Sequence, residues 1–180
     1  MKKPRLTAAL LGALLFTAIT TSLRPTRSFA IDSKPSLRPN SHCTTDEHII
    51  FNCTVKRSGK IVSLCSSKGL TREKGYLQYR FGLPGKVELE YPKTRTGTQA
   101  QFHYTHYFRY QVDLTEINFN IDGYEYQIFD TYNGEEKPAI SEEGVSVTAP
   151  GKPKQASFAC RGKATADYGN LQDVLGNDQN

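Results

Sequence analysis

The 180-residue sequence lacks the short motifs that mark most catalytic and metal-binding sites. It contains no GxSxG nucleophile elbow, and its four cysteines form no CxxC pair. Gly82, Gly85 and Gly97 precede no helical pattern, so they are interpreted as turn residues and not as a phosphate-binding loop. The sequence therefore predicts no catalytic residues, no metal site, no cofactor and no enzymatic activity.

Acidic residues are absent from residues 1–30, which have the three parts of a secretory signal peptide. Three basic residues open the segment, residues 6–23 are mostly apolar and uncharged, and residues 28–30 include small side chains suited to cleavage. An uncleaved anchor is the alternative, since the apolar run approaches the length that spans a bilayer. Such an anchor would then be the only contact with the membrane. The sequence predicts a periplasmic or secreted protein.

The rest of the chain has no excess of either charge. Of the 23 Lys and Arg residues, five lie in residues 1–30, so residues 31–180 contain 18 basic and 18 acidic residues. A general attraction to nucleic acid or to acidic membranes therefore loses its basis. An RNA-binding sheet would use aromatic side chains like those described below, but neutrality and export argue against it. Nucleic acid is not expected as a partner.

Helical periodicity is scarce, and short alternating strands begin at about residue 47. In residues 47–56, for example, Ile49, Phe51, Cys53 and Val55 share one face. Turn dipeptides such as Asp-Gly and Asn-Gly separate the strands. These patterns predict an all-β fold, either an antiparallel β-sandwich or a small β-barrel, with about eight or nine strands stapled by disulfides.

Composition divides the chain into four parts. Residues 1–30 are the predicted signal peptide, and residues 31–46, with two prolines and no apolar period, are predicted to be an extended linker. Residues 47–162 form the predicted β-domain. Residues 163–180 are rich in Gly, Asn, Asp and Gln and are predicted to be a flexible tail.

All four cysteines lie beyond the predicted signal peptide, and an even count in an exported chain predicts two disulfides. Four cysteines allow three pairings. Cys53 lies on the apolar face of its strand, and Cys160 lies on that of the last strand. If Lys56 pairs with Ile61, Cys53 faces Leu64, and Cys65 points to the opposite side. This argument predicts the pairs Cys53–Cys160 and Cys43–Cys65, although one bulge would reverse it.

The titratable residues form no obvious site. His103 and His106 are three positions apart, so on a strand they lie on opposite faces and cannot share a metal. Glu88 and Glu90 share one face and are interpreted as solvent-exposed. A hydrolase would have to bring carboxylates or histidines from different strands into one pocket.

Tyrosine is the most distinctive component, with ten tyrosines and no tryptophan. Tyrosine rings suit binding surfaces because they bury apolar area and keep a hydroxyl available. The alternative is ordinary packing, since tyrosine is a good strand former. The predicted binding surface consists of aromatic and basic residues on neighbouring strands: Tyr104, Tyr107, Arg109, Tyr110, Tyr124 and Tyr126.

The strings GKIVSLCSS, YLQYRFGLPGKVELEYP, FHYTHYFRY and FACRG resemble those of small uncharacterised exported proteins of Gram-negative bacteria. The resemblance spans residues 43–160 and implies an extracytoplasmic location and a β-rich fold. It brings no catalytic residues. A weaker similarity, of architecture only, is to membrane-bound or periplasmic lysozyme inhibitors.

Two functional hypotheses follow. The first is a non-enzymatic exported module that binds an unknown protein or envelope component. The alternative is an inhibitor or immunity protein directed at a cell-wall hydrolase or a secreted toxin.

Overall fold

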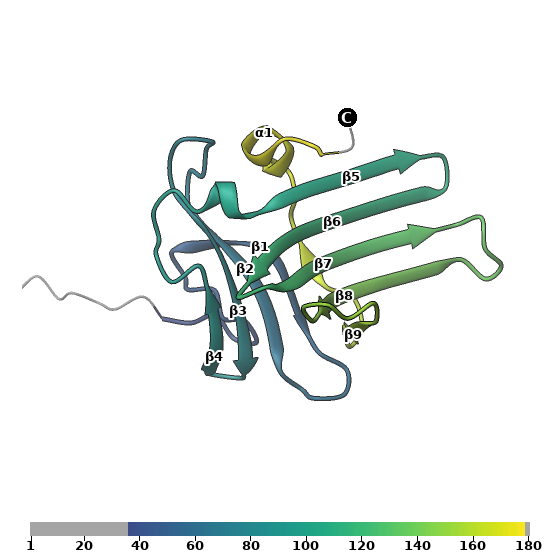
Figure 1. The fold of residues 1–180 in the computed structure, drawn as a ribbon, viewed down its shortest axis with the longest axis horizontal. Coiled ribbons are helices and arrows are strands. Elements are labelled where there is room, and N and C mark those ends of the chain that lie inside the picture. The colour runs from purple at the N-terminus through teal and green to yellow at the C-terminus, as the bar shows by residue number, and fades with distance from the viewer. Residues whose placement is uncertain (1–35, 179–180) are drawn as a thin grey trace, which may run out of the picture. The chain divides into compact units, whose positions relative to one another are not determined.

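Ten strands form two five-stranded antiparallel sheets in the computed structural model, which describes residues 36–178 (Figure 1). The first sheet has the order β10-β1-β2-β3-β4, and the second has the order β5-β6-β7-β8-β9. The strands of the first sheet are β1 (Glu47–Thr54), β2 (Ile61–Ser67), β3 (Leu77–Leu83), β4 (Lys86–Tyr91) and β10 (Thr165–Ala166). Those of the second are β5 (His103–Arg109), β6 (Val112–Ile121), β7 (Tyr124–Asn133), β8 (Ile140–Thr148) and β9 (Gln155–Ala159). A 3-10 helix, η1 (Gln99–Gln101), precedes β5, and α1 (Leu171–Leu175) follows β10.

Side chains of both sheets meet in one apolar core. The ring of Tyr79 in β3 lies 4.9 Å from that of Phe119 in β6 and 5.8 Å from that of Tyr126 in β7, measured between centroids. The sheets pack as a sandwich and do not close into a barrel. The predicted all-β, disulfide-bonded fold is confirmed, with ten strands where eight or nine were expected.

A bulge in β1 corrects the predicted pairing of β1 with β2. Cys53 lies opposite Val62, not Leu64, and the register shifts between Ile49 and Phe51. Ile50 is the extra residue, and it is fully buried in the core although the alternation places it on the polar face. The predicted register was wrong by two positions, which preserves the face of each residue from Phe51 onward.

Both disulfides follow the predicted pairing. Cys53–Cys160 joins β1 to the residue after β9, and it therefore links the two sheets covalently. Cys43–Cys65 joins the N-terminal segment to β2. The prediction holds because the error in register did not change which way Cys53 and Cys65 point.

The predicted linker is wrong for residues 36–46, which we name the strap. The strap folds back on itself through a bridge between Leu37 and Thr44, and it buries Ser41, His42 and Cys43. It covers the outer face of the first sheet, where its backbone bonds to Ser63 and Arg80. Residues 31–35 and the predicted signal peptide lie outside the described part of the chain.

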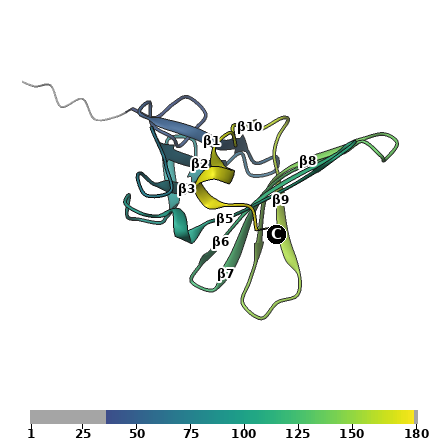
Figure 2. The same ribbon diagram turned by 90° about the horizontal axis from the view of Figure 1, so that it is seen from above.

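The predicted tail is also wrong for residues 163–178. β10 pairs with β1, and the two strands lie side by side (Figure 2). α1 buries Leu171 and Val174 in the core. These two residues lie three positions apart, so one helical turn directs both side chains to the same side. Among residues 36–178, no helix has the length and apolarity needed to cross a membrane.

Candidate functional site

The inner face of the second sheet changes from apolar to polar along its strands. One row across the sheet, set by the strand register, is apolar: Tyr104, Ile117, Ile128, Val145 and Phe158. The next row on the same face is polar: His106, Thr115, Asp130 and Glu143. The first row faces the first sheet, whereas residues of the C-terminal segment lie beside the second row. Two depressions of different chemistry result.

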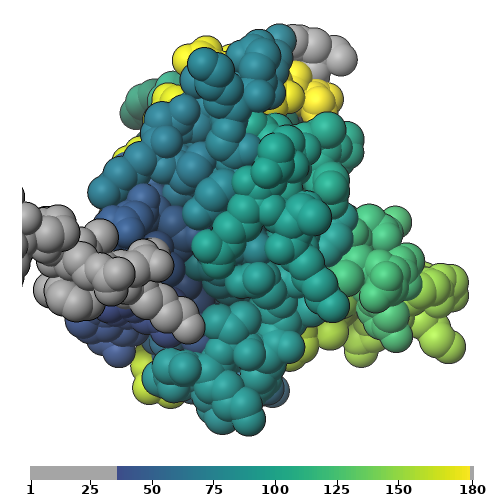
Figure 3. All heavy atoms as spheres, turned by 90° about the vertical axis from the view of Figure 1, so that its left-hand side faces the viewer, coloured from purple at the N-terminus to yellow at the C-terminus, as the bar shows by residue number. Residues whose placement is uncertain are grey.

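The apolar depression lies between the two sheets, has a volume of about 600 Å³, and is here named the groove. Tyr79, Phe81 and Leu89 line it from β3 and β4. The other wall comes from β7 to β9 and the adjoining turns: Tyr124, Tyr126, Val145, Val147, Ala149, Ala156 and Phe158. In Figure 3 the turn regions of β6–β7 and β8–β9, green and yellow-green, extend beyond the teal atoms of the first sheet.

Lysines stand at the edge of the groove. Lys60 forms an ion pair with Glu88 at 2.5 Å, and its ammonium lies 5.2 Å from the centroid of the Phe81 ring. Lys152 and Lys154 belong to the turn between β8 and β9 and are exposed. Of the described residues that line the groove, none is acidic. Its polar edge is therefore positive.

The polar depression, here named the cleft, has a volume of about 540 Å³ and lies between the second row and residues 163–172. It brings together a histidine and three carboxylates from four strands: His106, Asp113, Asp130 and Glu143. His106 Nε2 lies 2.9 Å from Asp113 Oδ1, and the Tyr168 hydroxyl donates to Asp130 Oδ2 at 3.1 Å. Glu143 accepts a hydrogen bond from the backbone N–H of Ala164.

Burial shifts the pKa of two groups in the cleft, Asp130 and Tyr168. It raises the pKa of Asp130, and the hydrogen bond from Tyr168 opposes that shift. Burial also raises the pKa of Tyr168, in the same direction as the neighbouring Asp130. The cleft thus meets one condition for a hydrolase, carboxylates from different strands. Asp113, Asp130 and Glu143 are each engaged by another group of the protein, so their hydrogen bonds hold the C-terminal segment and β5 in place.

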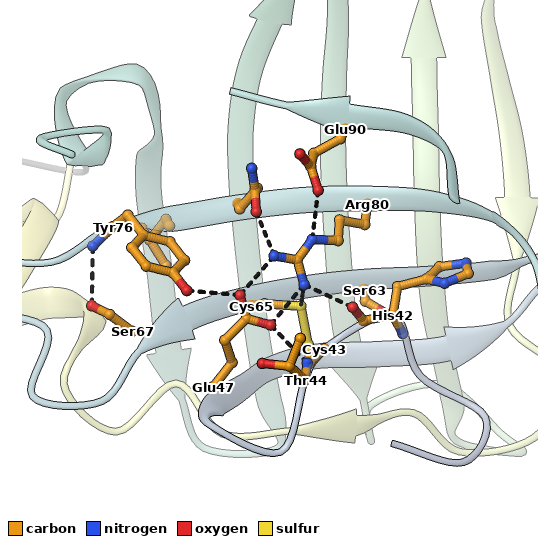
Figure 4. A network of polar contacts seen from close by, with 12 residues as sticks. His42, Cys43, Thr44, Glu47, Ser63, Cys65, Ser67, Tyr76, Arg80 and Glu90 are labelled. Atoms are coloured by element: carbon orange, nitrogen blue, oxygen red, sulfur yellow. Dashed lines mark hydrogen bonds and ion pairs between the residues drawn. A yellow bond between two sulfur atoms is a disulfide. The ribbon is translucent and has the colours of Figure 1, made fainter. Parts of the chain in front are cut away.

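A buried polar network occupies the outer face of the first sheet (Figure 4). Arg80 donates to both carboxylate oxygens of Glu47, at 2.7 and 2.6 Å, and both side chains are 2% exposed. Arg80 also donates to the backbone carbonyl of His42 in the strap, at 2.7 Å, and to Glu90 at 3.0 Å. The network therefore ties the strap to β1, β3 and β4.

The hydrogen bonds of this network set the charge of Glu47. Burial alone would raise its pKa, but hydrogen bonds from Arg80, the Thr44 backbone and Tyr76 lower the pKa to about 2. Cys43, Glu47 and Cys65 are, within residues 36–178, the one group of three His, Cys, Asp or Glu side chains close enough to share an ion. Because the two sulfurs form a disulfide and Glu47 binds Arg80, this set offers no metal site.

The predicted tyrosine surface is not continuous. Tyr104 is buried and lines the cleft, whereas Tyr124 and Tyr126 line the groove. Tyr107 and Arg109 lie near the end of β5, and Tyr110 is in the turn that follows. Arg109 pairs there with Glu135, with Nη2 and Oε2 2.6 Å apart.

Exposed apolar residues gather at that end of the second sheet, which we name the tip. The turn after β5 and the loop after β7 lie together at this end, away from the first sheet (Figure 1). Phe108 is 71% exposed and Tyr110 is 83% exposed. Tyr107, Tyr132 and Ile140 are also exposed. Sequence reasoning missed Phe108 and Ile140, although both adjoin turn residues in the sequence.

Comparisons of the chain with models of protein families, with curated proteins and with solved structures found no match. The functional argument therefore depends on the geometry of the groove, the cleft and the tip.

Proposed function

We propose that this domain is an exported, non-enzymatic module that binds another protein, and that the tip is its contact surface. The observation that carries the proposal is the group of exposed aromatic and aliphatic side chains at the tip: Tyr107, Phe108, Tyr110, Tyr132 and Ile140. Aromatic side chains are enriched in protein interfaces because they bury much area with few rotatable bonds. By the strand register, Phe108 and Tyr132 lie on one face of the sheet end, and Tyr107 and Ile140 lie on the other. The exposed side chains therefore surround the end of the sheet, and exposed apolar groups of this kind mark interaction sites.

Export agrees with this proposal. Two disulfides are typical of proteins in an oxidising compartment, and the first 30 residues have the composition of a signal peptide. The partner would then be a periplasmic, envelope or extracellular protein.

The alternative is an inhibitor or immunity protein for a cell-wall hydrolase or a secreted toxin. Its specific support is the form of the tip, where the β5–β6 turn and the β7–β8 loop end side by side (Figure 1). Two neighbouring strand connections can enter an active-site cleft as one body. The Arg109–Glu135 ion pair links them and would hold them together.

Affinity capture from envelope and culture fractions tests the proposal. The bait is the chain from residue 31, in three forms: unaltered, with Phe108→Ser and Tyr110→Ser together, and with Leu83→Ser. Leu83 is 43% exposed at the β3–β4 turn and is the matched control for removing an exposed apolar side chain.

The proposal expects a protein that the unaltered chain and Leu83→Ser capture and the tip variant does not. With that protein purified, the tip variant should bind at least about 30-fold more weakly, as for residues at the centre of an interface. Equal binding by all three forms would remove the tip from the function. If the captured protein is a hydrolase or toxin, loss of its activity on adding the domain would favour the inhibitor.

A further inference from the structure

The groove is an incomplete part of the core. Its deepest residues, Tyr79 and Val145, are almost fully buried and belong to the common core of the two sheets. Its outer apolar residues are not covered, since Phe158 is 42% exposed and Tyr124 is 44% exposed. A volume of about 600 Å³ lies within the range of about 300–1,000 Å³ that is usual for small-molecule sites.

Two lysines at the groove are available to a ligand. Lys152 and Lys154 alternate along the chain with Pro153, directly before β9, and both line the groove. Lys60 differs because Glu88 already neutralises it. Within the described chain, no ion pair involves Lys152 or Lys154.

From these two observations we infer that the groove binds a fatty acid. Its hydrocarbon chain lies along the apolar wall formed by Val147, Ala156 and Phe158, and its carboxylate meets the ammonium groups of Lys152 and Lys154. The hydrocarbon chain supplies the binding free energy by leaving water, and the lysines select an anionic head group.

The chemistry of the lining favours this occupant over a peptide. A peptide brings backbone N–H and C=O groups that need partners when buried. Apart from Ser58, the lysines and the tyrosine hydroxyls, the side chains that line the groove are apolar. A fatty acid has one polar end, which matches a groove that is polar at its edge alone. The inference does not depend on the tip, so either can fail without the other.

A titration with 11-(dansylamino)undecanoic acid, a fluorescent fatty acid, tests the site in the chain from residue 31. The probe should bind saturably to one site, with a blue-shifted emission that dodecanoic acid reverses. Ala156→Trp fills the groove from an exposed position and should weaken binding at least about tenfold, since it occupies the space of the acyl chain. Ser157→Trp is the matched control, because the next residue of β9 is exposed and points to the opposite face.

Head-group recognition is tested with dodecanoic acid and dodecanol as competitors. Lys152→Glu and Lys154→Glu together should weaken binding of the acid about tenfold or more and leave dodecanol unchanged, since charge complementarity acts on the anion alone. Lys68→Glu, in an exposed loop remote from the groove residues in the fold, should change neither.

Three results would overturn the inference. The first is that the probe does not bind saturably. The second is that Ala156→Trp and Ser157→Trp weaken probe binding equally. The third is that Lys152→Glu and Lys154→Glu together weaken binding of dodecanoic acid and of dodecanol equally. A fourth is self-association of the chain that Ala156→Trp abolishes, measured by sedimentation, because it would make a second copy the occupant.

Discussion

The two sheets differ in how their outer faces are covered. The strap lies on the outer face of the first sheet and leaves Ser63, Gln78 and Arg80 at most 2% exposed. On the outer face of the second sheet, Tyr107, Glu116 and Phe129 are half-buried or exposed. The strap thus covers the outer face of the first sheet, whereas the outer face of the second sheet is partly open. The groove and the cleft lie on the inner face of the second sheet, so all three candidate surfaces, with the tip, include residues of that sheet.

Each sheet contains an Arg–Glu ion pair, and the two pairs differ in their importance for stability. Arg80 and Glu47 are each 2% exposed, and the low dielectric around them makes a missing partner costly. Arg109 and Glu135 are 44% and 49% exposed, so water can replace either partner. The buried ion pair is therefore required for the stability of the fold, whereas the exposed ion pair can be replaced.

The covalent link between the sheets should give the largest effect. Cys53–Cys160 spans 107 positions and Cys43–Cys65 spans 22. In the chain-entropy account, replacing both cysteines of the first pair by alanine lowers the free energy of unfolding by about 5 kcal/mol, against about 3 kcal/mol for the second. Urea denaturation of the two double variants measures the difference. A larger loss for the strap disulfide would show that enclosing the first sheet matters more than joining the sheets.

Breaking the buried ion pair comes next. Arg80→Met leaves the Glu47 carboxylate buried without its main partner and should lower the free energy of unfolding by about 3–5 kcal/mol. Arg109→Met removes an exposed partner of Glu135 and should leave the free energy of unfolding nearly unchanged, because water can take the place of the lost partner. Denaturation of the two single variants under one set of conditions gives the comparison directly.

A double variant identifies the cause of that loss. In Arg80→Met with Glu47→Leu, no buried charge remains, so much of the stability lost in the single variant should return. If the double variant is as unstable as Arg80→Met, lost packing and lost bonds to the strap are responsible, and the buried charge is not.

Acid should destabilise the first sheet and its strap, because protonation of His42 and of Glu47 favours the unfolded chain. Burial lowers the pKa of His42 below its usual 6.5, so the unfolded chain takes up this proton more readily and stability falls as the pH drops below about 6.5. Glu47 has its pKa lowered from 4.5 to about 2, so its contribution is complete above pH 4.5 and is lost between pH 4.5 and 2. That second contribution amounts to about 3 kcal/mol.

Urea denaturation between pH 8 and pH 2 measures both steps. His42→Gln should flatten the part of the profile between about pH 6.5 and 5 and leave the lower part unchanged. An unaltered upper part in this variant would assign that loss to other groups.

The all-β fold and the disulfide pairing were predictable because both depend on alternation along single strands. Cys53 shares a strand face with Val55, and Cys160 shares one with Phe158, because residues two positions apart point the same way. An error of two positions in the register does not change these faces. The predicted face of Ile50 was wrong because the bulge depends on packing against the other sheet, which strand alternation does not reveal.

The strap and the C-terminal segment escaped prediction for a different reason. Both are polar in sequence, and both are held by contacts with residues far along the chain, such as His42 with Arg80 and Tyr168 with Asp130. The groove and the cleft depend on the same long-range order. Their residues come from five or more separate segments, and no spacing in the sequence indicates that Lys152 lies near Phe81 or Asp130 near Lys163.

Substitutions at the tip should give the smallest change in the free energy of unfolding, and they test most directly whether exposed residues of the second sheet contribute to stability. Phe108→Ser and Tyr110→Ser together should change the free energy of unfolding by no more than about 0.5 kcal/mol, because both side chains are already largely exposed. Thermal and urea denaturation of this variant, with Leu83→Ser as the control, measures the change. A loss above about 2 kcal/mol would mean that the aromatic residues pack within the fold. A small loss means that two large apolar side chains remain in water without stabilising the domain, as expected of residues kept for a partner.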